Sequence, residues 1–499
     1  MPYIELGEWR PDTPQHIQST ISDLSNMMPN AFGYDSVPSF EPITGPIIED
    51  GEPAKITGSR SFISSDGIVH TFAGTDKALY MLGAASWVDI SAEGGYNGLG
   101  NPWQFEIYGN YVLATNYADK IQLFDLSSTE DAKFEVMSET APRCRTLAIV
   151  NEFLMLGNVY DSIDGERPGR IWWGPIADPR GTWTPDQTTM CDYQDLAQGV
   201  NVVRIIGGES AKIFMRTAVI HGVFVGSPLV FQFETVEPAR GCVGINALDI
   251  VGDTVYFLSS DGFYALTNGN SATIGLNKLD KYVLNRIMGE ALSLSQCAVD
   301  YRNKVVWWAI PAVKTITNND NLLSTSVLYH YPSGKWGKVD KAFVSLHGLS
   351  TKGYTLDELD EINEILEQLP FPLDSVMYKG GIPVVGCFDE QGRLCYGYGL
   401  PMDAYVITGD APFGNHDSRT FVRRVRPTLG GTSKEHMMSI SGKQTISDED
   451  TFTSPTKLTR IGDFACRKTG RYHKIRFDLK GDWTEITGYA VTLDEEGTQ

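Results

Sequence analysis

Apolar and polar positions alternate in short runs over most of the chain, and turn residues separate the runs. This period of two residues is typical of half-buried β-strands. The strands recur in units of about 48 residues, and several units close on an aromatic side chain. The closing aromatics are Trp87, Phe134, Trp183, Phe231 and, after a less regular stretch, Trp336. A repeat of this length built only from strands indicates a β-propeller, because one blade cannot bury both of its faces alone.

Six such units can be followed through residues 56–345, and residues 379–400 supply further strands of the same kind. Asp66-Gly67 lies between two apolar runs, and the sequence Ser-Ser-Asp-Gly occurs both at 64–67 and at 259–262. Asp-Gly tolerates the positive φ of a tight hairpin, so both sites predict β-turns. We therefore predict an all-β chain with a β-propeller of six to seven blades.

Two terminal regions depart from the repeat. Residues 1–55 are rich in Pro, Asn, Gly and Ser, which predicts an extended N-terminal arm draped over a surface. Ile17, Ile21 and Leu24 fall near helical spacing, so this arm includes a possible short helix. Residues 401–499 alternate again and carry more basic residues, which favours a C-terminal β domain or the strands that close the propeller.

A third region, 346–378, is a predicted helical insertion. Residues 355–369 have apolar side chains at helical spacing, and Thr355 with Glu358 has the pattern of a capping box. Pro370 would end this acidic helix. The helix is either an interaction element or a cover for one edge of the propeller.

The net charge of −21 argues against general affinity for nucleic acid or for anionic membranes, since both need clustered Lys and Arg. No apolar run is long enough for a membrane span, and the N-terminus has no signal-peptide pattern. The seven cysteines are scattered, as buried thiols usually are. Cys387 and Cys395 face each other across a predicted hairpin, so contact between them is expected.

Motifs for catalysis are missing from the sequence. It contains no phosphate-binding loop, no zinc-protease motif and no nucleophile elbow, and the eight histidines show no metal-ligand spacing. We therefore expect no cofactor and no metal. Carboxylates at strand ends offer one alternative, since a pair of them meeting in a central channel would suit a glycosidase; the candidates are Asp249, Asp253, Asp261 and Asp300. Each of them is more simply explained as a turn residue.

Four segments carry a resemblance to a known family. They are LGEWRPDTP with NMMPNAFGYDSVPSF near the N-terminus, residues 353–381, the Phe-Asp-x-x-Gly hairpin at 388–392, and RYHKIRFDL followed by WTEITG near the C-terminus. In these segments the chain resembles the tail nozzle proteins of short-tailed bacteriophages, also called tail hub or packaged-DNA stabilisation proteins.

The resemblance implies a structural virion protein of the tail, assembled in the host cytoplasm and without enzymatic activity. Such proteins form a ring, here expected to be a hexamer, below the head-to-tail connector and act as a conduit and seal for phage DNA. The implied partners are other copies of the chain, connector or portal proteins, and tail fibre or needle proteins. Position and composition give a candidate interface of Trp9, Arg10, Glu358, Glu361, Glu364, Arg423, Arg424, Arg426, Arg471 and Lys474. The alternatives are a propeller enzyme acting on surface polysaccharide and a cellular propeller scaffold.

Overall fold

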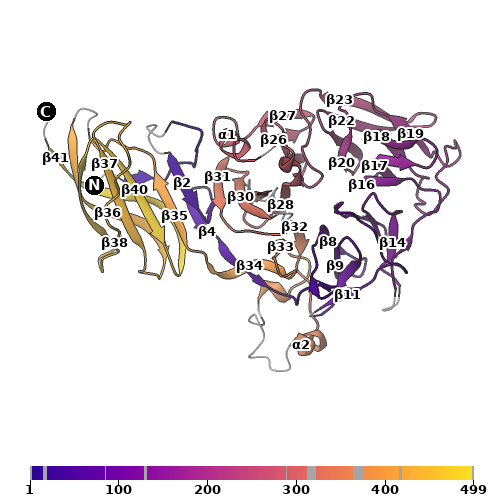
Figure 1. Ribbon diagram of the computed structural model, residues 1–499, viewed down its shortest axis with the longest axis horizontal. Helices are drawn as coiled ribbons and strands as arrows, with labels where there is room; N and C mark the ends of the chain where they lie inside the picture. Colours follow the sequence, from indigo (N-terminus) through magenta and orange to yellow (C-terminus); the bar gives the residue numbers. More distant parts are fainter. Residues whose placement is uncertain are drawn as a thin grey trace.

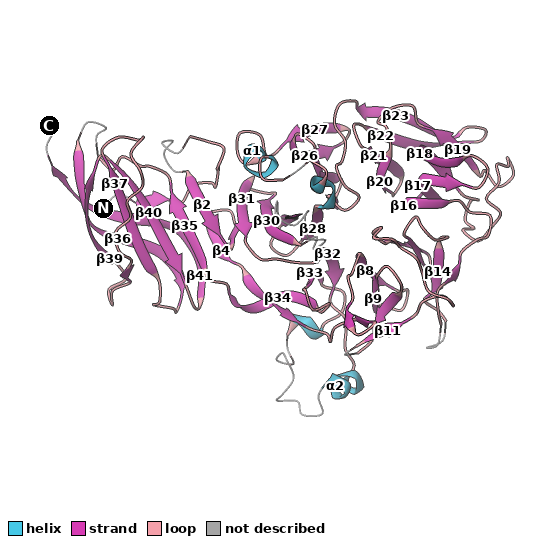
Figure 2. Cartoon of the chain, in the orientation of Figure 1, coloured by secondary structure: helices cyan, strands magenta, loops and turns pink. Residues whose placement is uncertain are grey.

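The protein is nearly all β, with 53% of residues in strands and 3% in helices, as the sequence predicts (Figure 2). A computed structural model describes residues 3–14, 20–84, 86–128, 132–287, 289–311, 322–362, 373, 375–414 and 418–496. The strands form many small antiparallel sheets, which fall into a seven-sheet body and a C-terminal sandwich.

The seven-sheet body consists of four-stranded antiparallel units, numbered here in chain order. Sheet 1 contains β8 (Gly58–Ile63), β9 (Val69–Gly74), β10 (Leu79–Leu82) and β11 (Trp87–Asp89). Sheet 2 contains β12 (Gln104–Tyr108), β13 (Tyr111–Thr115), β14 (Gln122–Asp125) and β15 (Glu135–Val136). Sheet 3 contains β16 (Arg143–Val150), β17 (Phe153–Asp161), β18 (Gly165–Trp173) and β19 (Asp192–Asp195). Sheet 4 contains β20 (Val202–Ile206), β21 (Ser210–Met215), β22 (Val219–Gly226) and β23 (Val230–Glu237). Sheet 5 contains β24 (Leu248–Val251), β25 (Thr254–Ser259), β26 (Gly262–Thr267) and β27 (Asn270–Thr273). Sheet 6 holds β28 (Gln296–Asp300), β29 (Val305–Pro311), β30 (Leu323–His330) and β31 (Lys335–Val339), and sheet 7 holds β32 (Ser345–Ser350), β33 (Pro383–Phe388), β34 (Leu394–Pro401) and β5 (Pro38–Pro42).

Neighbouring sheets pack through their first strands. β8 contacts β12, β12 contacts β16, β16 contacts β20, β24 contacts β28, and β28 contacts β32. Phe214 of β21 and Phe257 of β25 join sheets 4 and 5, with ring centroids 5.2 Å apart. β32 then contacts β8, so the series of contacts returns to its beginning (Figure 1). The last sheet is completed by β5, a strand from the N-terminal region.

The repeated aromatics have equivalent places in these units. Trp87, Phe231 and Trp336 lie in the fourth strands of sheets 1, 4 and 6, and Phe134 directly precedes the fourth strand of sheet 2. Trp183 lies in the loop that leads to β19 and is 2% exposed. Asp66-Gly67 forms the predicted turn between β8 and β9, where Gly67 has φ of 86°. The period along the sequence therefore corresponds to one sheet.

The C-terminal sandwich has two sheets with an apolar interior (Figure 1). One contains β1 (Tyr3–Glu5), β4 (Tyr34–Ser36), β36 (Arg419–Gly431), β39 (Phe464–Gly470) and β41 (Trp483–Glu496). The other contains β2 (Ile21–Ser25), β35 (Ala404–Thr408), β37 (Met437–Lys443), β38 (Thr456–Lys457) and β40 (Tyr472–Leu479). Ile475 and Phe477 of β40 and Val422 and Val425 of β36 are fully buried between them, consistent with the alternation in RYHKIRFDL.

The N-terminal region is built into both bodies rather than draped over a surface, which differs from the prediction. β2 pairs with β35 in the sandwich, and β5 pairs with β34 in sheet 7. Between them, β3 (Met27–Pro29) pairs with β31, and β4 pairs with β41, so sheet 6 continues into the sandwich. Residues 21–25 are a strand instead of the expected helix, because their apolar side chains enter the sandwich core; residues 15–19 lie outside the described chain.

Helices are short within the described residues. α1 (Asp280–Leu284) and the 3-10 turn η1 (Ala291–Leu294) follow sheet 5, and α2 (Leu356–Ile362) and the 3-10 turn η4 (Val376–Tyr378) lie between β32 and β33, while β6 (Ile48–Glu49) and β7 (Glu52–Pro53) form a small hairpin. The predicted capping box is present, because the Glu358 carboxylate accepts a hydrogen bond from the Thr355 amide at 2.9 Å and the Thr355 hydroxyl accepts one from the Glu358 amide at 3.3 Å. The predicted helix continued to residue 369, and its second half lies outside the described residues. Cys387 and Cys395 are directly opposite in β33 and β34, as predicted.

Candidate functional site

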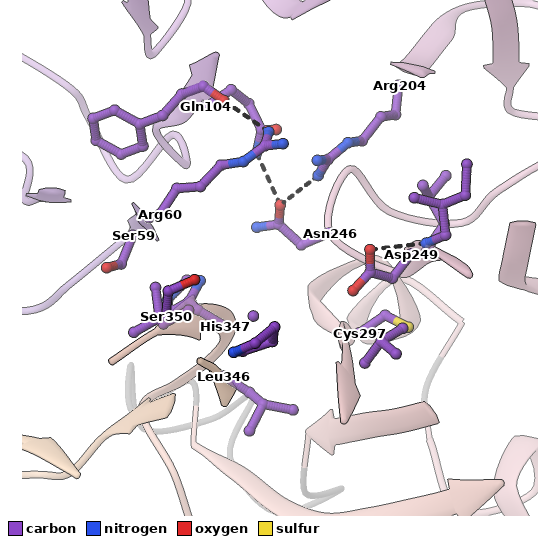
Figure 3. Close-up of a pocket in the computed structure, with 18 of the residues that line it drawn as sticks. Ser59, Arg60, Gln104, Arg204, Asn246, Asp249, Cys297, Leu346, His347 and Ser350 are labelled. Atoms are coloured by element: carbon purple, nitrogen blue, oxygen red, sulfur yellow. Dashed lines mark hydrogen bonds between the residues drawn. The ribbon is translucent and has the colours of Figure 1, made fainter. Parts of the chain in front are cut away.

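The first strands of the sheets surround a cavity of about 300 Å³. Residues of β8, β12, β20, β24, β28 and β32 line it, so it lies where six of the sheets converge. First strands are mostly apolar, as in Val202–Ile206, yet two of them carry an arginine into this space: Arg60 of β8 and Arg204 of β20. The cavity is therefore the place where charged side chains from distant parts of the sequence come together (Figure 3).

Arg204 is held by the loop that precedes β24. Its Nη1 donates to the Ile245 carbonyl at 3.0 Å and to Asn246 Oδ1 at 3.3 Å. Gln104 Nε2 donates to the same Asn246 oxygen at 2.8 Å (Figure 3). Because both contacts go to Oδ1, the orientation of the Asn246 amide is fixed by its hydrogen bonds.

Arg60 approaches the cavity from sheet 1. Its Nη1 donates to the Phe105 carbonyl at 2.9 Å and pairs with Glu106 at 3.2 Å. Burial lowers the pKa of Arg204, and the positive charge of Arg60 lowers it further. An arginine stays charged in proteins, so two like charges share a partly dry space.

Asp249 and His347 face the two arginines across the cavity (Figure 3). Asp249 Oδ1 accepts the Ile250 amide at 2.8 Å. Burial raises the pKa of Asp249, although that hydrogen bond and the charges of Arg204 and Arg60 oppose the rise. Burial also lowers the pKa of His347 to about 4, so its imidazole is neutral at neutral pH. The His347 side chain is 8% exposed, and its Nε2 has no hydrogen-bond partner among the described residues.

A second cavity, of about 420 Å³, lies among the loops that precede the first strands of sheets 2, 4, 5 and 6. Arg145, Arg216 and Tyr117 line it. The guanidinium of Arg145 lies 4.0 Å from the centroid of the Tyr117 ring, and Arg216 Nη1 donates to the Val243 carbonyl at 2.8 Å. Each of these two cavities is therefore lined by two arginines and one carboxylate, Asp249 in the first and Glu166 in the second.

Sequence reasoning missed Arg60 and Arg204. A charged side chain in the middle of an otherwise apolar first strand, as in Val-Val-Arg-Ile-Ile, was the available signal. Of the four carboxylates weighed for a glycosidase, the structure brings Asp249 to the first cavity, where it is the single carboxylate in the described lining. Asp253 and Asp261 lie in hairpin turns, and Asp300 accepts the Asn303 amide at 3.0 Å, as turn residues do.

The tryptophan pairs are packing residues. Trp172 and Trp173 enter two different hydrophobic clusters, and so do Trp307 and Trp308. Alternate side chains of a strand point to opposite faces, so each pair packs on both sides of its sheet.

Trp9 and Arg10, the first two predicted interface residues, have different environments. The Trp9 side chain is fully buried and packs edge-on against Tyr282 of α1, with ring centroids 5.3 Å apart. Its amide donates to the Tyr34 hydroxyl at 2.9 Å, and that hydroxyl donates to the Trp336 carbonyl at 3.1 Å. Trp9 is therefore an internal residue of the junction between the two bodies, which corrects its expected place on a surface. Arg10 is 41% exposed and pairs with Glu8 at 2.6 Å.

The predicted acidic interface lies on α2 and beyond it. Glu358 caps that helix and pairs with Lys352 at 2.9 Å, so part of its charge is already matched. Glu361 lies in α2, whereas Glu364 lies outside the described residues.

The predicted basic interface divides in the same way. Arg423, Arg424 and Arg426 are exposed on β36, where Arg423 pairs with Asp494 and Arg424 pairs with Asp463 at 3.5 Å. Arg471 is half-buried and directly precedes β40. Lys474 is buried and forms an ion cluster with Lys443, Asp410 and Asp450, which corrects its expected place on a surface.

No group of three or more His, Cys, Asp or Glu side chains in the described part of the chain has the arrangement of a metal site. No helix there is both long enough and apolar enough to span a membrane.

Comparisons with known proteins do not assign this chain to a family. No protein-family model matches the chain, and no curated protein sequence matches it. Two solved structures of the extracellular domain of a B. thetaiotaomicron sensor protein, one described as a hybrid two-component system and one as a one-component system, are similar at TM-scores of 0.39 and 0.40 with 11% and 12% identity. They match over 87% and 80% of this chain but 47% and 46% of their own, so the chain spans about half of their length. Likeness at this level supports no statement about function.

Proposed function

We propose that the seven sheets form a seven-bladed β-propeller and that the chain is a structural subunit of a bacteriophage tail. In this proposal several copies form the nozzle, or hub, ring below the head-to-tail connector and provide a conduit and seal for DNA. The propeller assignment is supported by the four-stranded units, by the contacts between their first strands, and by the return of β32 to β8. The N-terminal strand β5 then completes the last blade.

The observation that carries the tail proposal is the position of the segments that resemble nozzle proteins. Residues 6–14 and 26–40 include Trp9 and strands β3, β4 and β5, which join the propeller to the sandwich. The late segments supply β40 and β41 of the sandwich itself. The N-terminal and C-terminal parts of the resemblance therefore fall on the junction and the sandwich, whereas residues 353–381 and 388–392 belong to sheet 7 and its insertion. A resemblance at the junction is expected for a subunit that must transmit force in an assembly.

Electrostatics is consistent with this role. A net charge of −21 gives a surface along which DNA slides with little retention, because release of counterions holds DNA only to basic surfaces. The exposed arginines of β36 are an exception and would face an acidic neighbouring subunit or connector protein. Asp249 alone in the first cavity does not offer the carboxylate pair that a polysaccharide hydrolase uses.

The proposal is tested by light scattering and negative-stain imaging of the purified chain, alone and with connector rings from short-tailed phages. We expect rings of about six copies, alone or on the connector. Arg426→Glu on β36 should weaken the assembly, whereas Arg460→Glu, at an exposed turn of the same sandwich, should not. A chain that stays monomeric with every connector would overturn the proposal.

A further inference from the structure

The first cavity contains hydrogen-bonding groups that the fold itself does not use. Arg204 uses Nη1 for the Ile245 and Asn246 oxygens, and its Nε and Nη2 have no protein partner among the described residues. Asn246 accepts two hydrogen bonds at Oδ1, and its Nδ2 likewise has no acceptor among the described residues. A guanidinium edge beside an amide donor is suited to the two oxygens of a carboxylate.

The opposite side of the cavity offers different chemistry. His347 Nε2 is buried without a hydrogen-bond partner among the described residues, and Asp249 brings a carboxylate to the same lining, where the Ile250 amide and the Val299 backbone hold it. Leaving the His347 nitrogen dry and unpaired costs free energy, which a bound ligand with a hydroxyl group would recover. In Figure 3 these side chains and the two arginines surround one open space.

Size limits the ligand further. A cavity of about 300 Å³ is at the small end of ligand sites, which suits a molecule of about one sugar unit. We propose that this cavity binds a small polyhydroxylated carboxylate, such as a sugar acid, with its carboxylate on Arg204 and Asn246 and its hydroxyl groups on His347 and Asp249. Arg60 strengthens the attraction for the anion without direct contact.

This proposal does not depend on a role in a phage tail, because it rests on the cavity alone. The proposal applies to the first cavity and not to the second, because their arginines differ in their surroundings. In the second one, Arg145 is stacked on Tyr117 and also donates to Asn101 Oδ1 at 3.1 Å. No unpartnered buried histidine accompanies it among the described lining residues. Arg216 therefore provides a matched control for Arg204, since both donate to a backbone carbonyl at 2.8–3.0 Å.

The experiment is isothermal titration of the full chain with glucuronate, glucose and inorganic phosphate. We expect measurable binding of glucuronate at concentrations up to about 10 mM, with glucose and phosphate at least about tenfold weaker. Arg204→Gln should weaken glucuronate binding by about tenfold or more, and Arg216→Gln should leave it within about twofold.

Arg204→Lys keeps the positive charge but lacks the planar set of donors of a guanidinium, so it should also weaken glucuronate binding. This variant replaces Arg204→Gln if that protein does not fold. His347→Phe tests the hydroxyl side and should reduce the preference for glucuronate over acetate. Absence of glucuronate binding to the native chain, or unchanged binding in both Arg204 variants, would overturn the proposal. Phosphate bound as tightly as glucuronate would instead identify a simple anion site and would overturn the assignment to a sugar acid.

Discussion

The first cavity of the seven-sheet body and the C-terminal sandwich each bring two basic side chains together, but they balance those charges differently. In the sandwich, Lys443 and Lys474 both bond to Asp450 at 2.7 Å, and Asp410 lies 3.3 and 3.8 Å from them. In the first cavity, Arg60 has Glu106 at 3.2 Å, whereas Arg204 bonds only to neutral oxygens. The sandwich thus has two carboxylates for two cations in contact, and the cavity has an arginine, Arg204, without an ion-pair partner in the described part of the chain.

The pKa shifts of the two regions have opposite directions. Burial raises the pKa of Asp450, but hydrogen bonds from Lys443 and Lys474 outweigh it and hold that pKa below its usual range. Burial raises the pKa of Asp249, and its more distant arginines do not reverse the rise. Removing one partner from a buried ion cluster destabilises a fold, whereas titratable groups with perturbed pKa values in a cavity are more common at functional sites. The comparison therefore assigns the lysines to structure and the arginines to a ligand.

The largest effect is expected where the two regions join. Trp9→Ala removes a fully buried indole between α1, β31 and the N-terminal segment, so it should lower the free energy of unfolding by about 3–5 kcal/mol. Denaturant titration followed by tryptophan fluorescence would measure this. It should also separate the unfolding of the sandwich from that of the seven-sheet body.

Arg10→Ala is the matched control, because Arg10 is adjacent and partly exposed and should cost less than about 1 kcal/mol. If Trp9→Ala unfolds in one transition, at the same denaturant midpoint as the native chain, the strand pairings alone join the two regions. The seven-sheet body and the sandwich would then unfold as a single cooperative unit.

A second effect should appear in the sandwich. Asp450→Ala leaves two buried lysines with Asp410 as their remaining carboxylate, which should lower the free energy of unfolding by about 3 kcal/mol. This value is the lower end of the range for a broken buried ion pair, because Asp450 is 32% exposed. Since the pKa of Asp450 is lowered on folding, its contribution is present above the pKa of the unfolded chain and is lost as the pH falls. Unfolding midpoints at neutral and acidic pH would measure both effects.

Asp494→Ala breaks the exposed pair with Arg423 and should change stability by less than about 1 kcal/mol. Equal losses in the two variants would mean that the buried cluster contributes no more than a surface pair, and the contrast with the cavity would lose its basis.

A third effect concerns the buried histidines. Burial lowers the pKa of His347 in the cavity to about 4 and that of His473 in the sandwich to about 4, from 6.5. Between about pH 7 and about pH 5 these histidines bind protons in the unfolded chain but stay neutral in the folded chain. Each histidine should therefore lower the free energy of unfolding by about 2 kcal/mol over this range. His347→Phe should remove its share, since Phe keeps the ring beside Phe388 without a titrating nitrogen.

Unfolding curves of the native chain and the variant across this pH range would show a smaller slope in the variant. The contribution of His473 should persist as an internal control. An unchanged slope would mean that His347 is protonated in the folded chain and is already paired with a carboxylate.

Local features of this fold were predictable from the sequence. The Asp66-Gly67 turn, the capping box of Thr355 and Glu358, and the register of Cys387 with Cys395 each depend on neighbouring residues, and the structure contains all three. The spacing of the closing aromatics reports one sheet after another because each unit repeats the same four-strand pattern.

Long-range features were not predictable. β5 completes sheet 7 by pairing with β34, and no local signal specifies a partner so distant in the sequence. Trp9 and Lys474 were placed on a surface because composition cannot show which side of a strand or segment meets another body. Arg60 and Arg204 come from different sheets, and their meeting depends on how the sheets are arranged around the first cavity.

The smallest effect tests the charge balance of the cavity directly. Because folding raises the pKa of Asp249 above its unfolded value, its ionised form opposes folding at neutral pH, and this penalty disappears as acid protonates the folded carboxyl group. Asp249→Asn should therefore raise the free energy of unfolding at neutral pH by about 0.5–1 kcal/mol and have little effect in acid. Asp253→Asn, in the exposed turn four residues later, should be neutral at both pH values. A loss of stability in Asp249→Asn would show that this carboxylate already neutralises Arg204 and Arg60, and the cavity would then resemble the sandwich cluster, with no charge left for a ligand.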